Sequence, residues 1–259
     1  MFRTLGFATD ALVMRGRSTY EDKGDHICQR TPAEPSFWHG NRLIYRAIPS
    51  DPQQMLDAFG QTFPDARHCV FGFDIPDFDP PDWLMQLPGF KSERSDVLAT
   101  SQAITRPELR PGLTLKQIET DTDWAQIIEL QTQTGFEQGY SGTGYEAFVQ
   151  QRFTQFRRQC KKGLCAWFGV FDGPLLVADM GIVWDHRIAR FQCVETRASH
   201  RGQGICAALL GAVHHWVRKR SPNCTTVIVA DTDGAAGRIY RRAGFSHRET
   251  MLSVYKPGN

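Results

Sequence analysis

The chain has 259 residues, of which 41% are hydrophobic, and carries 30 Lys and Arg against 28 Asp and Glu. This length accommodates one large or two small globular domains, and the composition excludes a disordered or fibrous chain. The net charge of +2 gives no basic excess, so we expect no nucleic-acid partner. No stretch approaches 18 apolar residues and the N-terminus lacks a signal-peptide core, which predicts a cytoplasmic protein without a membrane partner.

Seven cysteines are scattered along the chain and form no Cys-x-x-Cys pair. Their odd number and their spacing disfavour both a disulfide framework and a zinc site. We therefore expect reduced thiols and no bound metal.

The first half of the chain is weakly patterned at its start and strand-rich afterwards. Residues 1–36 are polar and contain Gly and Pro, which predicts a poorly packed lead-in. Five elements are then expected: strand-like runs at 37–45, 69–75 and 96–104, and helical patterns near 55–59 and 80–88. Two prolines within 105–112 indicate a linker, so we assign domains to 37–110 and 113–259.

The second half has clearer periodicity. Its predicted helices cover 122–133, 145–160 and 205–220, and its predicted strands cover 165–171, 175–184, 188–196, 225–230 and a final run to 256. On the first of these helices Trp124, Ile127 and Ile128, with Gln131 as a further candidate, share one face.

An internal repeat is indicated when the sequence is shifted against itself by 155 residues. Gly89-Phe90 then meets Gly244-Phe245, and the run 69–75 meets 224–230. The order of strand, short helix, Gly-Phe and strand recurs, which favours two copies of one structural unit.

A strand-to-helix turn at residues 197–204 carries the most specific chemistry. Gly202 and Gly204 let the backbone approach a ligand closely, and the N–H groups that open the next helix suit a phosphate. Gly202-x-Gly204-x-x-Ala207, with Asp231 after the next strand, also fits a loose dinucleotide fingerprint. Five residues separate that strand from the first glycine, which disfavours a dinucleotide-binding oxidoreductase using NAD(P).

The same turn resembles the acyl-CoA pyrophosphate loop of the GNAT superfamily of N-acyltransferases. The pattern is Arg201-x-x-Gly204-x-Cys206, with Cys206 in place of the usual small residue. Downstream, residues 233–245 resemble the superfamily's Asn-x-x-Ala-x-x-Leu-Tyr-x-x-x-Gly-Phe segment, with Asp233 at the asparagine and Tyr240 at the tyrosine. The resemblance covers about residues 113–259.

The resemblance implies a set of binding residues. The backbone of Val194, Glu195 and Thr196 would pair with the pantetheine arm of acetyl-CoA at an exposed strand edge. The pyrophosphate would be held by Arg201, Gly202, Gln203, Gly204, Ile205, Cys206 and Ala207. Asp233 and Tyr240 complete the implied cofactor contacts, although a carboxylate at Asp233 suits a phosphate poorly.

Catalysis by this scaffold implies a base, an acid and donors for an oxyanion. Tyr240 falls at the family's general-acid tyrosine, and the alternative is a core aromatic beside Ile239. The family's frequent glutamate position holds Ile228 here, so Glu195 and Asp231 are the candidate bases. Backbone N–H groups of the strand would stabilise the oxyanion. The helix N-terminus would lower the pKa of Cys206.

The resemblance thus implies an α/β protein with the GNAT fold, a mixed, mostly antiparallel twisted sheet flanked by helices. We expect a tandem arrangement whose first copy is degenerate, since Arg46 matches Arg201 without either glycine and Met85 matches Tyr240. The implied function is transfer of an acetyl group from acetyl-CoA to a small-molecule or peptide amine. A non-catalytic acyl-CoA sensor is the alternative, and the sequence leaves the oligomeric state open.

Overall fold

The computed structural model describes residues 2–140 and 142–258, apart from the side chain of Thr143. The chain forms two compact units. Among the described residues, the first comprises 2–98, Val229–Gly237 and 247–258, and the second comprises Ala99–Ile228 and Arg238–Ser246. This division differs from the predicted domains 37–110 and 113–259, because the strand that ends the chain belongs to the first unit.

The first unit contains a sheet in the strand order β1-β2-β3-β4-β11-β5. Its elements are α1 (Leu5–Val13), β1 (Thr19–Asp22), β2 (His26–Arg30), a 3-10 turn (Trp38–Gly40), β3 (Arg42–Tyr45), α2 (Pro52–Thr62), β4 (Cys69–Phe73), α3 (Asp82–Met85), β5 (Lys91–Thr100) and β11 (Ser246–Lys256). Strands β3 and β4 are parallel, whereas β1–β2, β2–β3 and β4–β11 are antiparallel.

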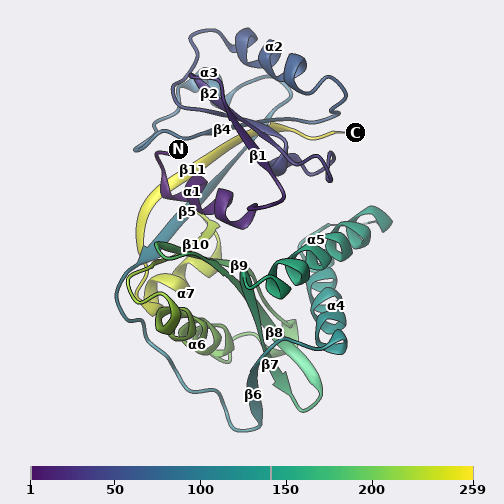
Figure 1. Cartoon of the computed structure of the whole chain (residues 1–259), viewed down its shortest axis with the longest axis vertical. Coiled ribbons are helices and arrows are strands. Elements are labelled where there is room, and N and C mark those ends of the chain that lie inside the picture. The colour runs from purple at the N-terminus through teal and green to yellow at the C-terminus, as the bar shows by residue number, and fades with distance from the viewer. Residues whose placement is uncertain (1, 141, 259) are drawn as a thin grey trace. The chain divides into compact units, whose positions relative to one another are not determined.

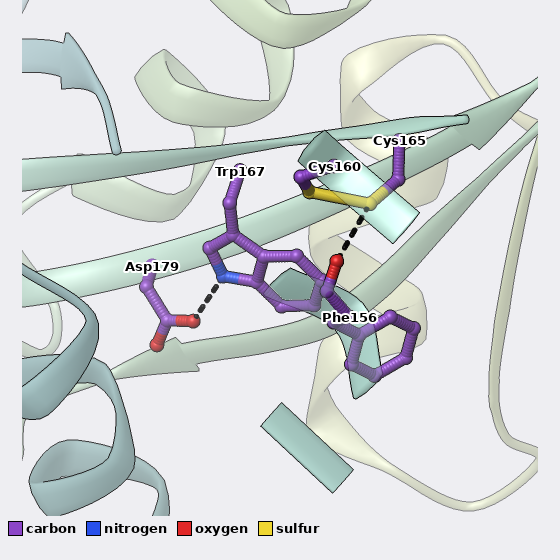
Figure 2. Close-up of a disulfide and its surroundings, with 5 residues drawn as sticks. All are labelled: Phe156, Cys160, Cys165, Trp167 and Asp179. Atoms are coloured by element: carbon purple, nitrogen blue, oxygen red, sulfur yellow. Dashed lines mark hydrogen bonds between the residues drawn. A yellow bond between two sulfur atoms is a disulfide. The ribbon is translucent and has the colours of Figure 1, made fainter. Parts of the chain in front are cut away.

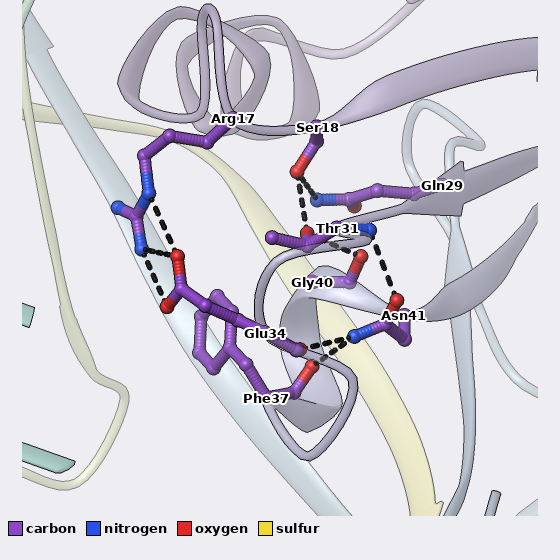
Figure 3. A network of polar contacts seen from close by, with 8 residues as sticks. All are labelled: Arg17, Ser18, Gln29, Thr31, Glu34, Phe37, Gly40 and Asn41. Atoms are coloured by element: carbon purple, nitrogen blue, oxygen red, sulfur yellow. Dashed lines mark hydrogen bonds and ion pairs between the residues drawn. The ribbon is translucent and has the colours of Figure 1, made fainter. Parts of the chain in front are cut away.

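The expectation of a poorly packed lead-in at residues 1–36 is wrong. Phe7 of α1 and Ile27 of β2 are buried together with Ile44. Polar side chains also order this segment: Arg17 pairs with Glu34, as Figure 3 shows. Asn41 Nδ2 donates to the carbonyl oxygen of Glu34 at 2.8 Å. Polar side chains of this kind satisfy irregular backbone without leaving a hydrophobic period, which explains why the sequence pattern was weak here.

The second unit contains the strand order β10-β9-β8-β7-β6. Its elements are β6 (Leu113–Gln117), α4 (Asp121–Glu137), α5 (Thr143–Lys161), β7 (Cys165–Asp172), β8 (Leu175–Trp184), β9 (Ile188–Thr196), α6 (Ile205–Arg220), β10 (Thr225–Asp231) and α7 (Ala235–Ala243). Strands β6 to β9 are antiparallel and β10 is parallel to β9. Helices α4 and α5 cover one face of β7–β9 and α6 covers the other (Figure 1). The predicted mixed, mostly antiparallel sheet flanked by helices is thus confirmed.

Among the described residues, none of the helices combines the length and the apolarity that crossing a bilayer requires. Helix α4 continues past its predicted end, and Gly135, inside its last turn, makes room for the ring of Tyr145. The capping box of Thr120 and Asp123 fixes its start.

Trp167 of β7 is the centre of the core beneath α4 and α5. Its side chain is fully buried and contacts the rings of Trp124, Phe153 and Phe156. Its indole Nε1 donates a hydrogen bond to the Asp179 carboxylate at 2.8 Å (Figure 2).

Cys160 at the end of α5 and Cys165 at the start of β7 form a disulfide (Figure 2). The expectation of reduced thiols is therefore wrong for this pair, while the five other cysteines are free. Gly163, with φ of 69°, reverses the chain between them. The close approach depends on this turn and not on a recognisable cysteine spacing.

Replacement of Gly181 by Ala is expected to destabilise the second unit by about 1–3 kcal/mol, because a Cβ would collide with the Trp167 ring. Denaturant unfolding measures this loss. A matched control is Gly144→Ala, where the new Cβ has no heavy atom within 4 Å. Equal stability of the Gly181→Ala variant and the wild type would show that the core accommodates the methyl group.

Candidate functional site

The candidate site begins where β9 and β10 stop pairing. The two strands are in register at only three positions, Ile188–Arg190 against Thr225–Val227. In the described part of the chain, residues 191–196 have no further register partner on β10, while β8 pairs with β9 as far as Thr196. One backbone edge of Val194, Glu195 and Thr196 can therefore accept an extended ligand, as a sheet edge does.

A β-bulge interrupts the regular pairing of β8 with this segment of β9. Asp179 is opposite Glu195 and Gly181 is opposite Gln192, so two residues of β9 face one residue of β8 in between. Cys193 adopts a φ of 49°, which is unusual for a residue other than glycine. Its carbonyl oxygen accepts a hydrogen bond of 3.0 Å from Gln131 Nε2.

The turn after β9 has the geometry of an anion site. Gly202 and Gly204 have φ of 74° and 78°, and a Cβ on either would have no heavy atom within 4 Å. Gly204 is the N-cap of α6, whose first N–H groups lack intrahelical acceptors. Open space, positive φ and oriented N–H donors together fit a phosphate group at Gly202, Gln203, Gly204, Ile205, Cys206 and Ala207.

Arg201 supplies a cation beside this turn. Its Nε donates to the Thr196 carbonyl oxygen at 2.9 Å, and its Nη2 pairs with Glu137 Oε2 at 2.7 Å. Both side chains of the ion pair are about half exposed, so the pair is weak and a phosphate can replace the carboxylate.

Glu195, Cys206 and Tyr240 come from three different elements and lie within electrostatic range of one another. Tyr240 of α7 is 4% exposed, and burial followed by the neighbouring Cys206 and Glu195 raises its pKa. Burial is also the main cause of the raised pKa of Glu195, which Gln138 lowers in part through a 3.5 Å hydrogen bond. A retained phenol proton and a more basic carboxylate are suited to an acid and a base.

The thiol of Cys206 has a higher pKa than the sequence predicted. Burial and the charge of Glu195 raise the pKa of its thiol to about 11, so the predicted lowering by the helix N-terminus is wrong. The protonated thiol is a poor nucleophile and acts here as a small packing residue.

The two remaining predicted residues, Asp231 and Asp233, belong to the first unit. Both are exposed, Asp231 at the end of β10 and Asp233 in the turn before α7. Asp231 raises the pKa of Glu93 by its charge. Their roles as base and cofactor contact stay predictions.

The second unit brings three further polar residues to the site that the sequence did not identify as site residues: Gln131, Gln138 and Asp179. A signal for one of them existed, since Asp179 interrupts the otherwise apolar run of β8. In the described ranges, no group of three or more His, Cys, Asp or Glu side chains is arranged to hold a metal ion.

Comparison with known proteins agrees with this geometry. Residues 124–245 match the model of the acetyltransferase (GNAT) family. A search among curated proteins gives no match. Among solved structures, a functionally unknown conserved protein from Staphylococcus epidermidis ATCC 12228 has a TM-score of 0.71 at 12% identity, covering 95% of this chain and 96% of that one.

Two further structures share the fold over most of the chain. A GCN5-related N-acetyltransferase from Kribbella flavida has a TM-score of 0.66 at 17% identity and covers 97% of this chain and 93% of that one. A tandem GNAT protein from the clavulanic acid biosynthesis pathway has a TM-score of 0.58 at 11% identity, with coverage of 93% and 83%. Residues 124–245, slightly less than half of the chain, thus form a domain that matches the acetyltransferase (GNAT) family.

Proposed function

We propose that the second unit transfers an acetyl group from acetyl-CoA to a primary amine in a ternary complex. The observation that carries this proposal is the position of Glu195, Cys206 and Tyr240 at the point where β9 and β10 stop pairing, next to the anion-binding turn at Gly202–Gly204. The edge of β9 would hold the pantetheine arm. The turn and Arg201 would hold the pyrophosphate.

Three parts of the site act in the reaction: a base, donors for the oxyanion and an acid. Glu195 accepts a proton from the ammonium group, and the neutral amine then attacks the thioester carbonyl carbon. Backbone N–H groups of the β9 edge stabilise the negative charge that develops on the carbonyl oxygen. Tyr240 donates its proton to the departing thiolate as the carbon–sulfur bond breaks, and the raised pKa keeps that proton available at neutral pH. The attacking nitrogen loses a proton as the amide forms, and this proton restores the phenol of Tyr240.

We also infer a tandem arrangement with a degenerate first copy. A shift of 155 residues carries β5 (Lys91–Thr100) onto 246–255, within β11, and carries the start of β4 (Cys69) onto Cys224, beside the start of β10. The first copy lacks the two glycines and the tyrosine, so we assign acetyl-CoA binding to the second unit alone.

Release of free thiol from acetyl-CoA in the presence of a panel of small amines and peptide N-termini tests this function. We expect amine-dependent thiol release and a product heavier by one acetyl group. Binding of acetyl-CoA without turnover on any amine would favour the acyl-CoA sensor, which the substitution at Asp233 supports.

Tyr240→Phe is expected to lower kcat by about 10²-fold while it leaves the affinity for acetyl-CoA unchanged, because the phenol acts only as the thiolate leaves. Steady-state kinetics with the best amine measure both quantities. Tyr20→Phe, which removes another buried hydroxyl from the first unit, is the control and keeps the wild-type kcat. If Tyr240→Phe has the same kcat as the wild type, Tyr240 is not the general acid but a core aromatic residue.

A further inference from the structure

Asp179 carries a buried carboxyl that the reaction described so far does not use. The residue lies within β8 and is 0% exposed. Gln131 Nε2 donates to its two carboxyl oxygens at 3.0 and 3.1 Å, and Trp167 Nε1 donates at 2.8 Å (Figure 2). Burial of a carboxyl is costly, so a group retained in this position needs an explanation beyond packing.

Gln131 connects Asp179 to the bulge of β9. The same Nε2 atom that contacts Asp179 also donates to the carbonyl oxygen of Cys193 at 3.0 Å. Cys193 is the residue with positive φ, and Glu195 follows two residues later. The orientation of the β9 edge is thus tied to a carboxyl on the neighbouring strand.

Asp179 also faces Glu195 directly. The two residues are register partners on antiparallel strands, so their side chains are neighbours on one face of the sheet. Two adjacent carboxyls resist simultaneous ionisation. Burial, with a smaller contribution from the charge of Glu195, raises the pKa of Asp179 to about 8. Glu195 is therefore the first of the pair to ionise.

We propose that Asp179 is a positioning residue for the acyl transfer, acting through Gln131 on the β9 bulge and through its facing carboxyl on Glu195. This inference rests on the proposed function. Near neutral pH the pair holds one proton on Asp179, which leaves Glu195 free to accept the proton of the ammonium group. When Asp179 loses this proton at higher pH, its negative charge lies opposite Glu195 and makes Glu195 a stronger base.

Other titratable and charged groups also surround this pair. The titratable and charged side chains that face the pair are Glu137 at the end of α4, Tyr145 and Arg152 of α5, Arg190 and Cys193 of β9, Arg201 after β9, Cys206 of α6 and Tyr240 of α7. The pKa values of the two tyrosines and the two cysteines are raised above their ordinary values. These four groups therefore ionise above the pKa of about 8 of Asp179.

The test uses the full chain and two variants, Asp179→Asn and Gln131→Met. The indole N–H resonance of Trp167 reports the charge of Asp179, since the two groups are hydrogen-bonded. We expect this resonance to titrate near pH 8 in the wild type and to lose that step in Asp179→Asn. In Gln131→Met the step moves to higher pH, because the carboxylate loses a hydrogen-bond donor.

The pH profile of kcat gives the functional readout. We expect Asp179→Asn to lose the ionisation near pH 8 and to lower kcat about tenfold, with KM for acetyl-CoA unchanged. Ionisation of the amine substrate is common to all variants and serves as an internal reference. Asp123→Asn removes another buried carboxyl, from the capping box of α4, and is expected to lower stability without changing the profile.

Wild-type pH profiles in both variants would overturn the positioning role and leave Asp179 as a purely structural residue. If Asp179→Asn does not fold, the test rests on Gln131→Met. A midpoint of its indole titration equal to that of the wild type would then overturn the positioning role. Turnover without an indole titration would overturn the positioning role alone. An indole titration without turnover on any amine would overturn the proposed function and the positioning role with it.

Discussion

Gly204→Glu is expected to weaken acetyl-CoA binding about 100-fold or more. The substitution forces a side chain into a φ of 78° and adds a negative charge at the helix N-terminus that would bind the pyrophosphate. Isothermal titration calorimetry with acetyl-CoA measures the change in Kd. The expected loss is larger than for removal of Arg201, whose cation is about half exposed and already shared with Glu137.

The matched control is Gly173→Glu in the turn between β7 and β8. Gly173 also has a positive φ, 54°, and also faces open space, so this variant likewise places a side chain on a residue with positive φ and adds the same charge. Its Kd for acetyl-CoA should equal that of the wild type. Equal Kd values for Gly204→Glu and the wild type would place the pyrophosphate elsewhere in the molecule.

Glu195→Gln is expected to lower kcat/KM for the amine by about 10²–10⁴-fold at neutral pH, because the amide cannot accept the ammonium proton. Steady-state rates of thiol release between pH 6 and pH 10 measure the effect. In the wild type, activity should fall as the pH drops through the pKa of Glu195, which burial raises above that of an exposed glutamate. The deficit of the variant should shrink at high pH, where the amine is already neutral.

Glu129→Gln in α4 provides the control for this variant. Glu129 is exposed and pairs with Arg197 at 3.4 Å, so its loss should leave the rate and its pH dependence unchanged. A constant deficit of Glu195→Gln at all pH values would exclude Glu195 as the base. Asp231 would then be the remaining candidate of the two.

The conformation of the turn at Gly202–Gly204 could be predicted from the sequence because every local signal agrees there. A strand, two glycines and a strongly periodic helix follow one another, and the structure has β9, the positive φ of Gly202 and Gly204, and α6 in that order. Hydrophobic periodicity likewise located the β7–β8 hairpin and α5. Such features are local, so a single pass along the chain finds them.

Features that depend on contacts between distant residues could not be predicted in this way. The insertion of β11 between β4 and β5 pairs the last strand with residues about 180 positions away, and no local pattern specifies that partner. The Asp179–Gln131–Cys193 connection requires the register of β8 on β9 and the packing of α4. The disulfide was missed because its two cysteines meet only through a tight turn.

Thermal stability measured in parallel with acetyl-CoA, free CoA, NAD⁺ and NADP⁺ tests whether the second unit binds acetyl-CoA. A ligand that binds only the native state raises stability by about 2.7 kcal/mol at 100 times its Kd. We predict a higher melting temperature with acetyl-CoA and CoA, no change with either dinucleotide, and loss of the shift in Gly204→Glu. A higher melting temperature with NAD⁺ or NADP⁺ and no change with acetyl-CoA or CoA would contradict acetyl-CoA binding. It would instead indicate that the turn at Gly202–Gly204 binds a dinucleotide.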